Sequence, residues 1–220
     1  MNLIKTTTSF TARMAAAGAM GLILAAVPAA EAVAHPHPVK HHGAVVTVGN
    51  LKAAGGAAVV TLDPTVTTGA AALGITFAPT APATGAGSIW TLPITGGRVA
   101  WLTRTPVVGP PVTKVLGGEL RFGGGFTATK AATVVTITDI VASLEPGNHG
   151  RVFARVNGDK RRIPALQITD VSLNVSARSA TATLGITRAT AVLLNKALST
   201  TSFAAGQKVG TVAVTVPAPV

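Results

Sequence analysis

The 220-residue chain contains no cysteine and no tyrosine, and it has 7 acidic side chains against 18 basic ones. Without cysteine the fold cannot depend on disulfides, and no lipid can be attached through an N-terminal cysteine. With two tryptophans and six phenylalanines, the chain has little of the stacking surface expected of a single-strand nucleic-acid binder. We therefore expect no nucleic acid among its partners. The excess of basic side chains predicts a surface that attracts anions.

Residues 1–34 have the order of features of a secretory signal peptide. Lys5 and Arg13 lie in a basic opening segment, an apolar run follows over residues 14–27, and small residues end at Ala34. That run is shorter than the roughly 20 residues that cross a bilayer, so we expect cleavage after Ala34, or after Ala32, rather than an anchor. Removing two basic residues and one acidic residue with this segment leaves 16 basic and 6 acidic side chains, a formal charge of +10. We predict a secreted, extracellular protein, released or cell-wall associated, with no transmembrane segment in its mature form.

Four of the five histidines follow the expected cleavage point, in a segment over residues 35–43 that is rich in histidine and proline. These candidate metal ligands are His35, His37, His41 and His42. Short histidine-rich tracts bind Cu²⁺ or Zn²⁺, and cleavage after Ala34 would add the free amine of the first histidine. Pro36 has no N–H to deprotonate, which blocks a square-planar site through the backbone amides. The tract is therefore either a loose metal site or a flexible terminus, and no other cofactor is expected.

Short β-branched runs separated by glycine and proline fill most of the remaining chain. Examples are AVVTVGN, AAVVTLD, SIWTLPI, RVAWLT and VGTVAVTV. Many short strands at this spacing predict an antiparallel β-sandwich or barrel-like domain. About 186 residues suffice for one sizeable core, and no linker divides them convincingly. We expect a mostly β single domain over residues 44–220, with one or two short helices.

Two segments interrupt the strand pattern with a capped helix. Asp63-Pro64 precedes TVTTGAAAL, and Thr187 precedes RATAVLLNKAL. Aspartate and threonine accept hydrogen bonds at helix N-termini, and proline suits the first helical position. Helical spacing of the apolar residues predicts a helix over residues 188–198.

The segment RVFARVNGDKRRI predicts a hairpin, because Asn157-Gly158 suits a two-residue type I′ turn between two strand-like runs. That turn pairs Arg155 with Lys160 and Phe153 with Arg162, which gathers basic side chains on one face. The candidate anion-binding residues are Arg151, Arg155, Lys160, Arg161 and Arg162. Their expected partner is an anionic cell-wall polymer or another envelope component. The alternative is a solvated strand face without a partner.

Two other segments predict irregular backbone. In TVVTITDIVASL the apolar positions change parity between Ile137 and Ile140, which predicts a β-bulge near Thr138 and Asp139. Three consecutive glycines at 123–125 are not followed by a helix start, so they indicate a bulged turn and not a phosphate-binding loop.

Side chains suited to catalysis are few, and the sequence contains no GxSxG, HExxH or GxxxxGK[ST] motif. Glu119 and Asp139 lie on candidate neighbouring strands, where they either form an acid/base pair or make surface salt bridges with Arg121 or Lys130. Trp90 and Trp101, expected on adjacent strands, either stack on a flat ligand or fill the core. We predict a protein that is not an enzyme.

Five segments carry a resemblance to known proteins. They are LDPTVTTGAAALGITFAP, LPITGGRV, GGELRFGGGFTATKAATVVTITDIVASL, RVFARVNGDKRRIPALQITD and ATAVLLNKALSTTSFAAGQKVGTVAV. In this order they resemble exported β-rich domains of high-GC Gram-positive bacteria and are distantly similar to the HtaA-type haem-uptake surface domain. The resemblance implies a β-rich surface domain. In the haem-binding domains a tyrosine oxygen ligates the iron, and this chain has no tyrosine for that role.

Together these features predict a secreted, non-enzymatic protein that binds to the cell envelope or supports its structure, with an unknown ligand. The alternative is a copper- or zinc-binding protein, or a carrier of these metals, that uses the N-terminal histidine tract.

Overall fold

The computed structural model describes residues 45–218; the expected signal peptide, residues 1–34, and the histidine tract at 35–43 lie outside them. The described part contains twelve strands and two helices. The strands are β1 (Val45–Ala53), β2 (Ala57–Leu62), β3 (Ile75–Thr80), β4 (Thr84–Ala86), β5 (Ile89–Thr105), β6 (Val112–Phe122), β7 (Gly125–Lys130), β8 (Thr133–Glu145), β9 (His149–Val156), β10 (Ile163–Asn174), β11 (Ser179–Ile186) and β12 (Lys208–Thr215). The helices are α1 (Pro64–Ala72) and α2 (Arg188–Ala197).

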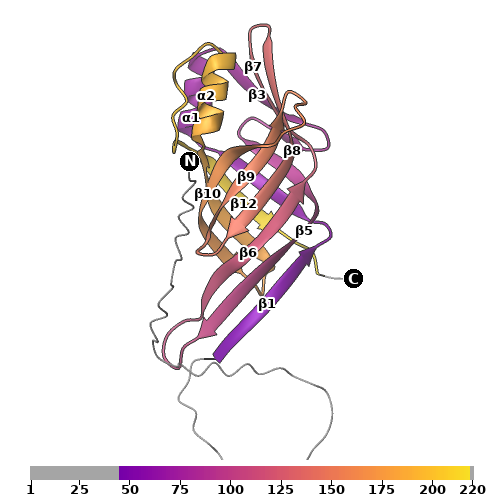
Figure 1. The fold of residues 1–220 in the computed structure, drawn as a ribbon, viewed down its shortest axis with the longest axis vertical. Helices are drawn as coiled ribbons and strands as arrows, with labels where there is room; N and C mark the ends of the chain where they lie inside the picture. Colours follow the sequence, from indigo (N-terminus) through magenta and orange to yellow (C-terminus); the bar gives the residue numbers. More distant parts are fainter. Residues whose placement is uncertain (1–44, 219–220) are drawn as a thin grey trace, which may run out of the picture. The chain divides into compact units, whose positions relative to one another are not determined.

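Eight of the strands close into an antiparallel barrel (Figure 1). Their order is β5-β2-β12-β11-β10-β9-β8-β6, and β6 closes the ring because it pairs with both β8 and β5. Of the two architectures that the sequence left open, the structure is the barrel. Closure leaves inward-facing side chains from all eight strands to fill one interior.

Additional strands extend the two ends of the barrel. Where α1 and α2 lie, β3 pairs with β7, and β7 pairs with the first part of β8. At the other end, β1 pairs with Gly97–Thr105 of β5, and β6 pairs with the other edge of that segment. We call β1, Gly97–Thr105 and the facing residues 112–120 of β6 the projecting sheet. It extends beyond the barrel because β2, the barrel strand next to β5, pairs with residues 89–93 of β5 and not with Gly97–Thr105.

The 17-residue strand β5 corrects the sequence analysis, which divided it into two shorter strands. Gly96-Gly97 resembles a turn signal, but here it lies within the strand. A Cβ atom on Gly97 would lie 2.2 Å from the carbonyl oxygen of Glu119, so glycine is needed for close strand approach and not for a turn. Trp90 and Trp101 therefore lie on one strand and not on adjacent strands.

Both predicted helices are confirmed with their caps. The Asp63 carboxylate accepts a hydrogen bond from the Thr65 N–H at 3.0 Å, and hydrogen bonds from Thr65 lower the pKa of this carboxyl group. The Thr187 hydroxyl oxygen accepts from the Thr190 N–H at 3.2 Å. These side chains satisfy donors that the first helical turn leaves unpaired.

The predicted bulge in β8 is confirmed, since the register with β9 shifts between Thr138 and Val141 and Asp139 has a φ of 53°. The predicted hairpin register is wrong. Asn157 and Gly158 adopt the positive φ values of the expected turn, but Ala154 pairs with Ile163, and Phe153 pairs with Pro164. Proline cannot donate to the ladder, and residues 157–162 form a loop between the strands instead of continuing the pairing.

Candidate functional site

The interior of the barrel is incompletely filled. It contains a partly open cavity of ≈ 170 Å³ lined by side chains from all eight barrel strands, from β3 and β7 and from both helices. The lining side chains are apolar except for Thr181 and Thr190. Several inward positions carry alanine, namely Ala58, Ala142, Ala154, Ala165, Ala180 and Ala182. An eight-stranded barrel is normally just wide enough for its side chains to fill, so these small residues leave the space.

Trp90 is one of the residues that line this apolar surface, and its ring carries a polar N–H. Its side chain lines the cavity, and the residue is 4% exposed. The ring stacks on Phe126, with centroids 5.5 Å apart, and meets Phe77 edge to face at 6.4 Å. Within residues 45–218, the buried indole N–H has no hydrogen-bond partner. A buried donor without an acceptor is costly, and buried polar groups are nearly always paired.

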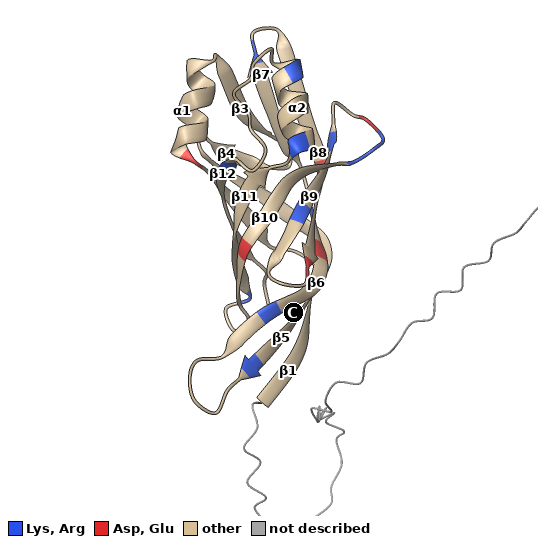
Figure 2. Cartoon of the chain, turned by 60° about the vertical axis from the view of Figure 1, so that its left-hand side comes forward, with Lys and Arg blue, Asp and Glu red and all other residues tan. Residues whose placement is uncertain are grey.

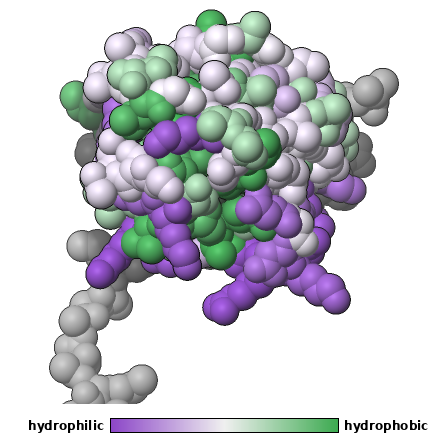
Figure 3. Space-filling view, turned by 90° about the horizontal axis from the view of Figure 1, so that it is seen from above, coloured by the Kyte–Doolittle hydropathy of each residue, from purple (hydrophilic) through white to green (hydrophobic). Residues whose placement is uncertain are grey.

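A second hollow, of ≈ 200 Å³, lies outside the barrel between α1 and residues 202–207. Val66 and Phe203 line both this outer hollow and the interior cavity. The two spaces are therefore separated by these side chains. Figure 3, which views the molecule from the end where the helices lie, shows apolar side chains reaching the surface among hydrophilic ones.

The position of Phe203 depends on α2. The Asn195 side chain donates to the Phe203 carbonyl oxygen at 2.8 Å and accepts from the Phe203 N–H at 3.1 Å. One side chain thus holds both backbone polar groups of the residue that separates the two hollows.

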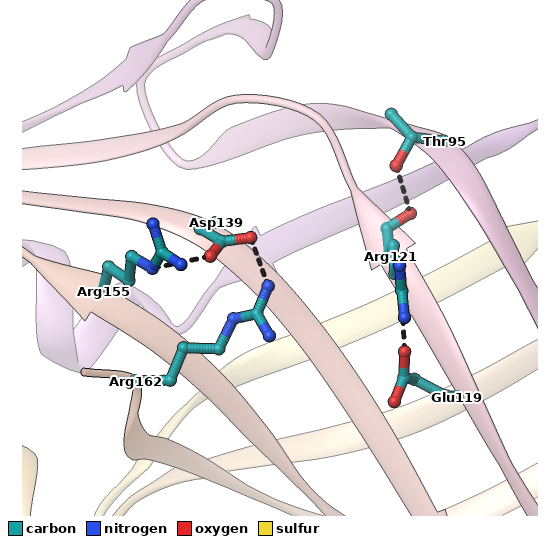
Figure 4. A network of polar contacts seen from close by, with 6 residues as sticks. All are labelled: Thr95, Glu119, Arg121, Asp139, Arg155 and Arg162. Atoms are coloured by element: carbon teal, nitrogen blue, oxygen red, sulfur yellow. Dashed lines mark hydrogen bonds and ion pairs between the residues drawn. The ribbon is translucent and has the colours of Figure 1, made fainter. Parts of the chain in front are cut away.

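The candidate anion-binding residues lie on a different part of the surface, on β9 and the loop that follows it. Arg155 and Arg162 both pair with Asp139, at 2.9 and 2.6 Å (Figure 4). The hydrogen bond from Arg162 is the largest cause that lowers the pKa of Asp139, and the positive charges of Arg162 and Arg155 lower it further. Two of the five predicted cations are therefore already paired with this one carboxylate.

The other three are placed differently. Arg151 lies 3.9 Å from Glu145. Lys160 and Arg161 are exposed in the loop 157–162 and make no ion pair with a carboxylate of residues 45–218. Anion binding by this set stays a prediction.

The structure places the candidate acid/base pair in separate ion pairs. Glu119 pairs with Arg121 at 2.7 Å, while Asp139 lies between its two arginines (Figure 4). Trp101 lies across Gly49 on the projecting sheet, since a Cβ atom at Gly49 would come within 2.3 Å of the indole ring. Its partner in the sequence analysis, Trp90, is buried in the barrel.

No cluster of three potential metal ligands occurs within residues 45–218. His149, at the start of β9, lies 3.4 Å from Glu145. The candidate ligands His35, His37, His41 and His42 lie outside the described residues, so metal binding by them stays a prediction.

No pattern in the sequence taken by itself predicted the cavity. A signal for it exists, because alanine recurs at inward positions of β8, β9, β10 and β11. These alanines can be recognised as inward-facing only when the strand register is known. None of the helices within residues 45–218 has the length and hydrophobicity to span a membrane.

No protein-family model matches the chain. No curated protein sequence matches it either. The solved structures that match this chain include three from Corynebacterium glutamicum. The C-terminal domain of HtaA is 14% identical, with a TM-score of 0.50, over 74% of this chain and 96% of that chain. The N-terminal domain of HtaA is 12% identical (TM-score 0.44, over 76% and 99%), and the heme binding protein HtaB is 12% identical (TM-score 0.43, over 76% and 95%). The match to the C-terminal domain of HtaA confirms the resemblance in fold over most of this chain.

Proposed function

We propose that the chain is an exported, non-enzymatic binding protein of the cell envelope that takes a small, predominantly apolar ligand into its barrel. The observation that carries this proposal is an apolar cavity that the inward alanines leave open and that the ring of Trp90 lines. The indole N–H of this ring is buried and unpaired among the described residues. A ligand with one hydrogen-bond acceptor would satisfy this donor, and its apolar part would fill the space that the alanines leave.

The volume of the cavity limits the ligand. An apolar cavity of about 150 Å³ stays dry and binds benzene, and the space here is ≈ 170 Å³. Sites for drug-sized ligands are larger, about 300–1,000 Å³. The ligand class is therefore an uncharged compound of the size of a substituted benzene or a short hydrocarbon chain. A charged group is disfavoured because no ionisable side chain of residues 45–218 lines the cavity.

Haem, which the fold suggests, does not fit the described residues. The chain has no tyrosine, and the one histidine within residues 45–218, His149, lies beside Glu145 and does not line the cavity. A macrocycle with two carboxylates also exceeds the apolar space of ≈ 170 Å³. A small apolar ligand meets both constraints.

The outer hollow provides an access route. Val66 and Phe203 separate it from the cavity, so a change of the Phe203 rotamer would connect the two. Small ligands reach closed apolar cavities through side-chain movements of this kind.

The test is a fluorescence titration with bromobenzene, whose heavy atom quenches a tryptophan that it contacts. The Trp101→Phe variant leaves Trp90 as the reporter, since the chain has two tryptophans. We expect saturable quenching in this variant. Adding Ala182→Leu, which fills the cavity from its wall, should remove the saturable component. Quenching that stays linear in bromobenzene, or that is unchanged by Ala182→Leu, would contradict the proposal.

The role of the indole N–H is tested with Trp90→Phe, which keeps an aromatic ring in the cluster and removes the donor. Calorimetry compares bromobenzene with 4-bromoanisole, whose ether oxygen is an acceptor. A neutral hydrogen bond contributes about 1 kcal/mol, or about fivefold in affinity. We expect the preference of the native chain for 4-bromoanisole to disappear in the variant. An unchanged preference would remove Trp90 from the site.

A further inference from the structure

One face of the projecting sheet combines exposed valines with basic side chains. Antiparallel partners point to the same face of a sheet. Val46, Arg104 and Val112 form one row across the three strands, because Val46 pairs with Arg104 and Arg104 pairs with Val112. All three residues are exposed.

The neighbouring rows continue this composition. Val48 pairs with Leu102, which pairs with Lys114. Nearer the barrel, Lys52 pairs with Arg98, which pairs with Glu119, and the Glu119 carboxylate forms its ion pair with Arg121. The four cations of this face, Lys52, Arg98, Arg104 and Lys114, make no ion pair with any carboxylate of residues 45–218. Figure 2 shows basic segments where β5 and β6 extend beyond the barrel.

The hairpin that joins β5 to β6 adds an apolar tip to this face. Val107 and Val108 are 73% and 88% exposed, the highest exposures of any large apolar side chain within residues 45–218. The tip has the sequence PVVGPP, with Pro106 before the valines and Pro110-Pro111 after Gly109. Proline fixes φ and restricts the loop, so little conformational entropy is lost when such a tip is immobilised.

We propose that this face, with Val107 and Val108 at its tip, docks on the surface of an anionic lipid bilayer. The valines would enter the interface between headgroups and acyl chains, and the four cations would lie against the anionic headgroups. This arrangement is typical of proteins that lie on a membrane without spanning it, for which apolar burial and electrostatic attraction add. It would hold the chain at the envelope independently of the barrel cavity.

Charge and exposure favour a lipid surface over the other occupants. A second copy docked face to face would bring Arg104 and Lys114 against their own equivalents, and like charges in contact are repelled. A soluble anionic polymer would pair with the cations but would leave Val107 and Val108 in water. A bilayer with anionic headgroups accommodates both kinds of side chain.

The test is sedimentation with vesicles of phosphatidylcholine alone and of phosphatidylcholine mixed with phosphatidylglycerol, at low and high salt. We expect binding to the mixed vesicles that weakens with salt. Each cation near such a surface contributes about fivefold, so Arg104→Ser/Lys114→Ser should reduce binding by about 30-fold. Val107→Ser/Val108→Ser should reduce it by about tenfold or more, given the transfer free energy of two valine side chains.

Matched controls distinguish an effect of this face on vesicle binding from an effect of the overall charge and hydrophobicity of the chain. Arg188→Ser/Lys196→Ser removes two exposed cations elsewhere, and Val134→Ser/Val192→Ser removes two valines that are 51% and 60% exposed. Both controls should change vesicle binding by less than about twofold. All variants share the same N-terminus, so any contribution of residues 1–34 cancels.

Three outcomes would overturn the proposal. They are equal binding to uncharged vesicles, equal losses in the controls, and loss with Arg104→Ser/Lys114→Ser but not with Val107→Ser/Val108→Ser, which would indicate a soluble anion site. A fifth variant, Val108→Trp in the Trp101→Phe background, reports the position of the tip directly. Its emission should shift to shorter wavelength on anionic vesicles, and an unshifted spectrum in the bound state would exclude insertion of the tip.

Discussion

Asp139 both adopts the left-handed backbone conformation of a β-bulge and forms ion pairs with two arginines on the surface. It occupies the bulge of β8 with a φ of 53°, a conformation that aspartate and asparagine tolerate better than other non-glycine residues. From this position its carboxylate reaches Arg155 on β9 and Arg162 in the following loop. The bulge therefore directs the side chain to the arginines that the sequence analysis assigned to anion binding.

Asp139→Asn should make stability less dependent on acid pH. The folded-state pKa of Asp139 lies below its ordinary value of 3.8, so its ion pairs stabilise the fold fully above that pH and are lost as pH falls through the lowered pKa. Asparagine keeps the left-handed conformation and removes the charge. Because the carboxylate is 34% exposed, solvent screening limits the expected loss to about 1 kcal/mol at neutral pH.

Urea unfolding of the native chain and of Asp139→Asn at a series of pH values measures this effect. The two stability curves should converge as pH falls below 3.8. A constant difference across the acid range would mean that the ion pairs contribute nothing that depends on the charge of Asp139.

Among the elements, α2 connects strand β10 with the segment around Phe203 at one end of the barrel. Thr187 caps the helix and donates a hydrogen bond to the carbonyl oxygen of Pro164 on β10. Asn195, near the other end of the helix, holds Phe203 by two hydrogen bonds. The helix thereby fixes the segment that separates the outer hollow from the cavity.

Asn195→Ala should loosen this segment while leaving the barrel folded. Two hydrogen bonds to backbone groups are lost, which costs about 1–3 kcal/mol. Hydrogen exchange of the amides of residues 200–207 should accelerate, and bromobenzene should enter the cavity faster. Lys196→Ala, a neighbouring change on the same helix, serves as the control. Equal exchange in the two variants would show that Asn195 does not hold the segment.

Local signals in the sequence were sufficient to predict several structural elements. The caps Asp63 and Thr187, the change of parity at Asp139 and the Asn157-Gly158 turn each act within a few residues, and the structure confirms all of them. The continuity of β5 and the pairing after the hairpin turn depend on neighbouring strands. Glycine is needed at position 97 because the backbone of β6 approaches it closely. No local sequence pattern distinguishes a glycine required by such an approach from a glycine in a turn.

At the scale of the whole molecule, the sequence predicted an antiparallel β fold but not its interior. The cavity depends on how eight strands align, and the alanines that create it come from segments far apart in the chain. Trp90 was expected either to fill the core or to stack on a flat ligand, and the structure places it in the barrel interior, where it lines the cavity. Pairing between strands that are distant in the sequence brings these residues together around one cavity.

The unfilled interior makes a prediction about stability. Ala182→Leu places three additional carbon atoms in existing space, so it should leave the free energy of unfolding unchanged or raise it by about 1 kcal/mol. Ala128 is 0% exposed but does not line the cavity. Ala128→Leu should therefore destabilise the fold by about 1–3 kcal/mol through overpacking. Thermal unfolding of both variants measures the difference, and equal destabilisation would mean that the barrel is already filled.

The most direct measurement is a crystal structure of the chain soaked with bromobenzene, in which anomalous scattering locates the bromine. We predict a bromine peak inside the barrel, next to the indole ring of Trp90, that disappears in Ala182→Leu crystals. Bromine peaks confined to the outer surface, with the interior filled by protein side chains alone, would contradict the account.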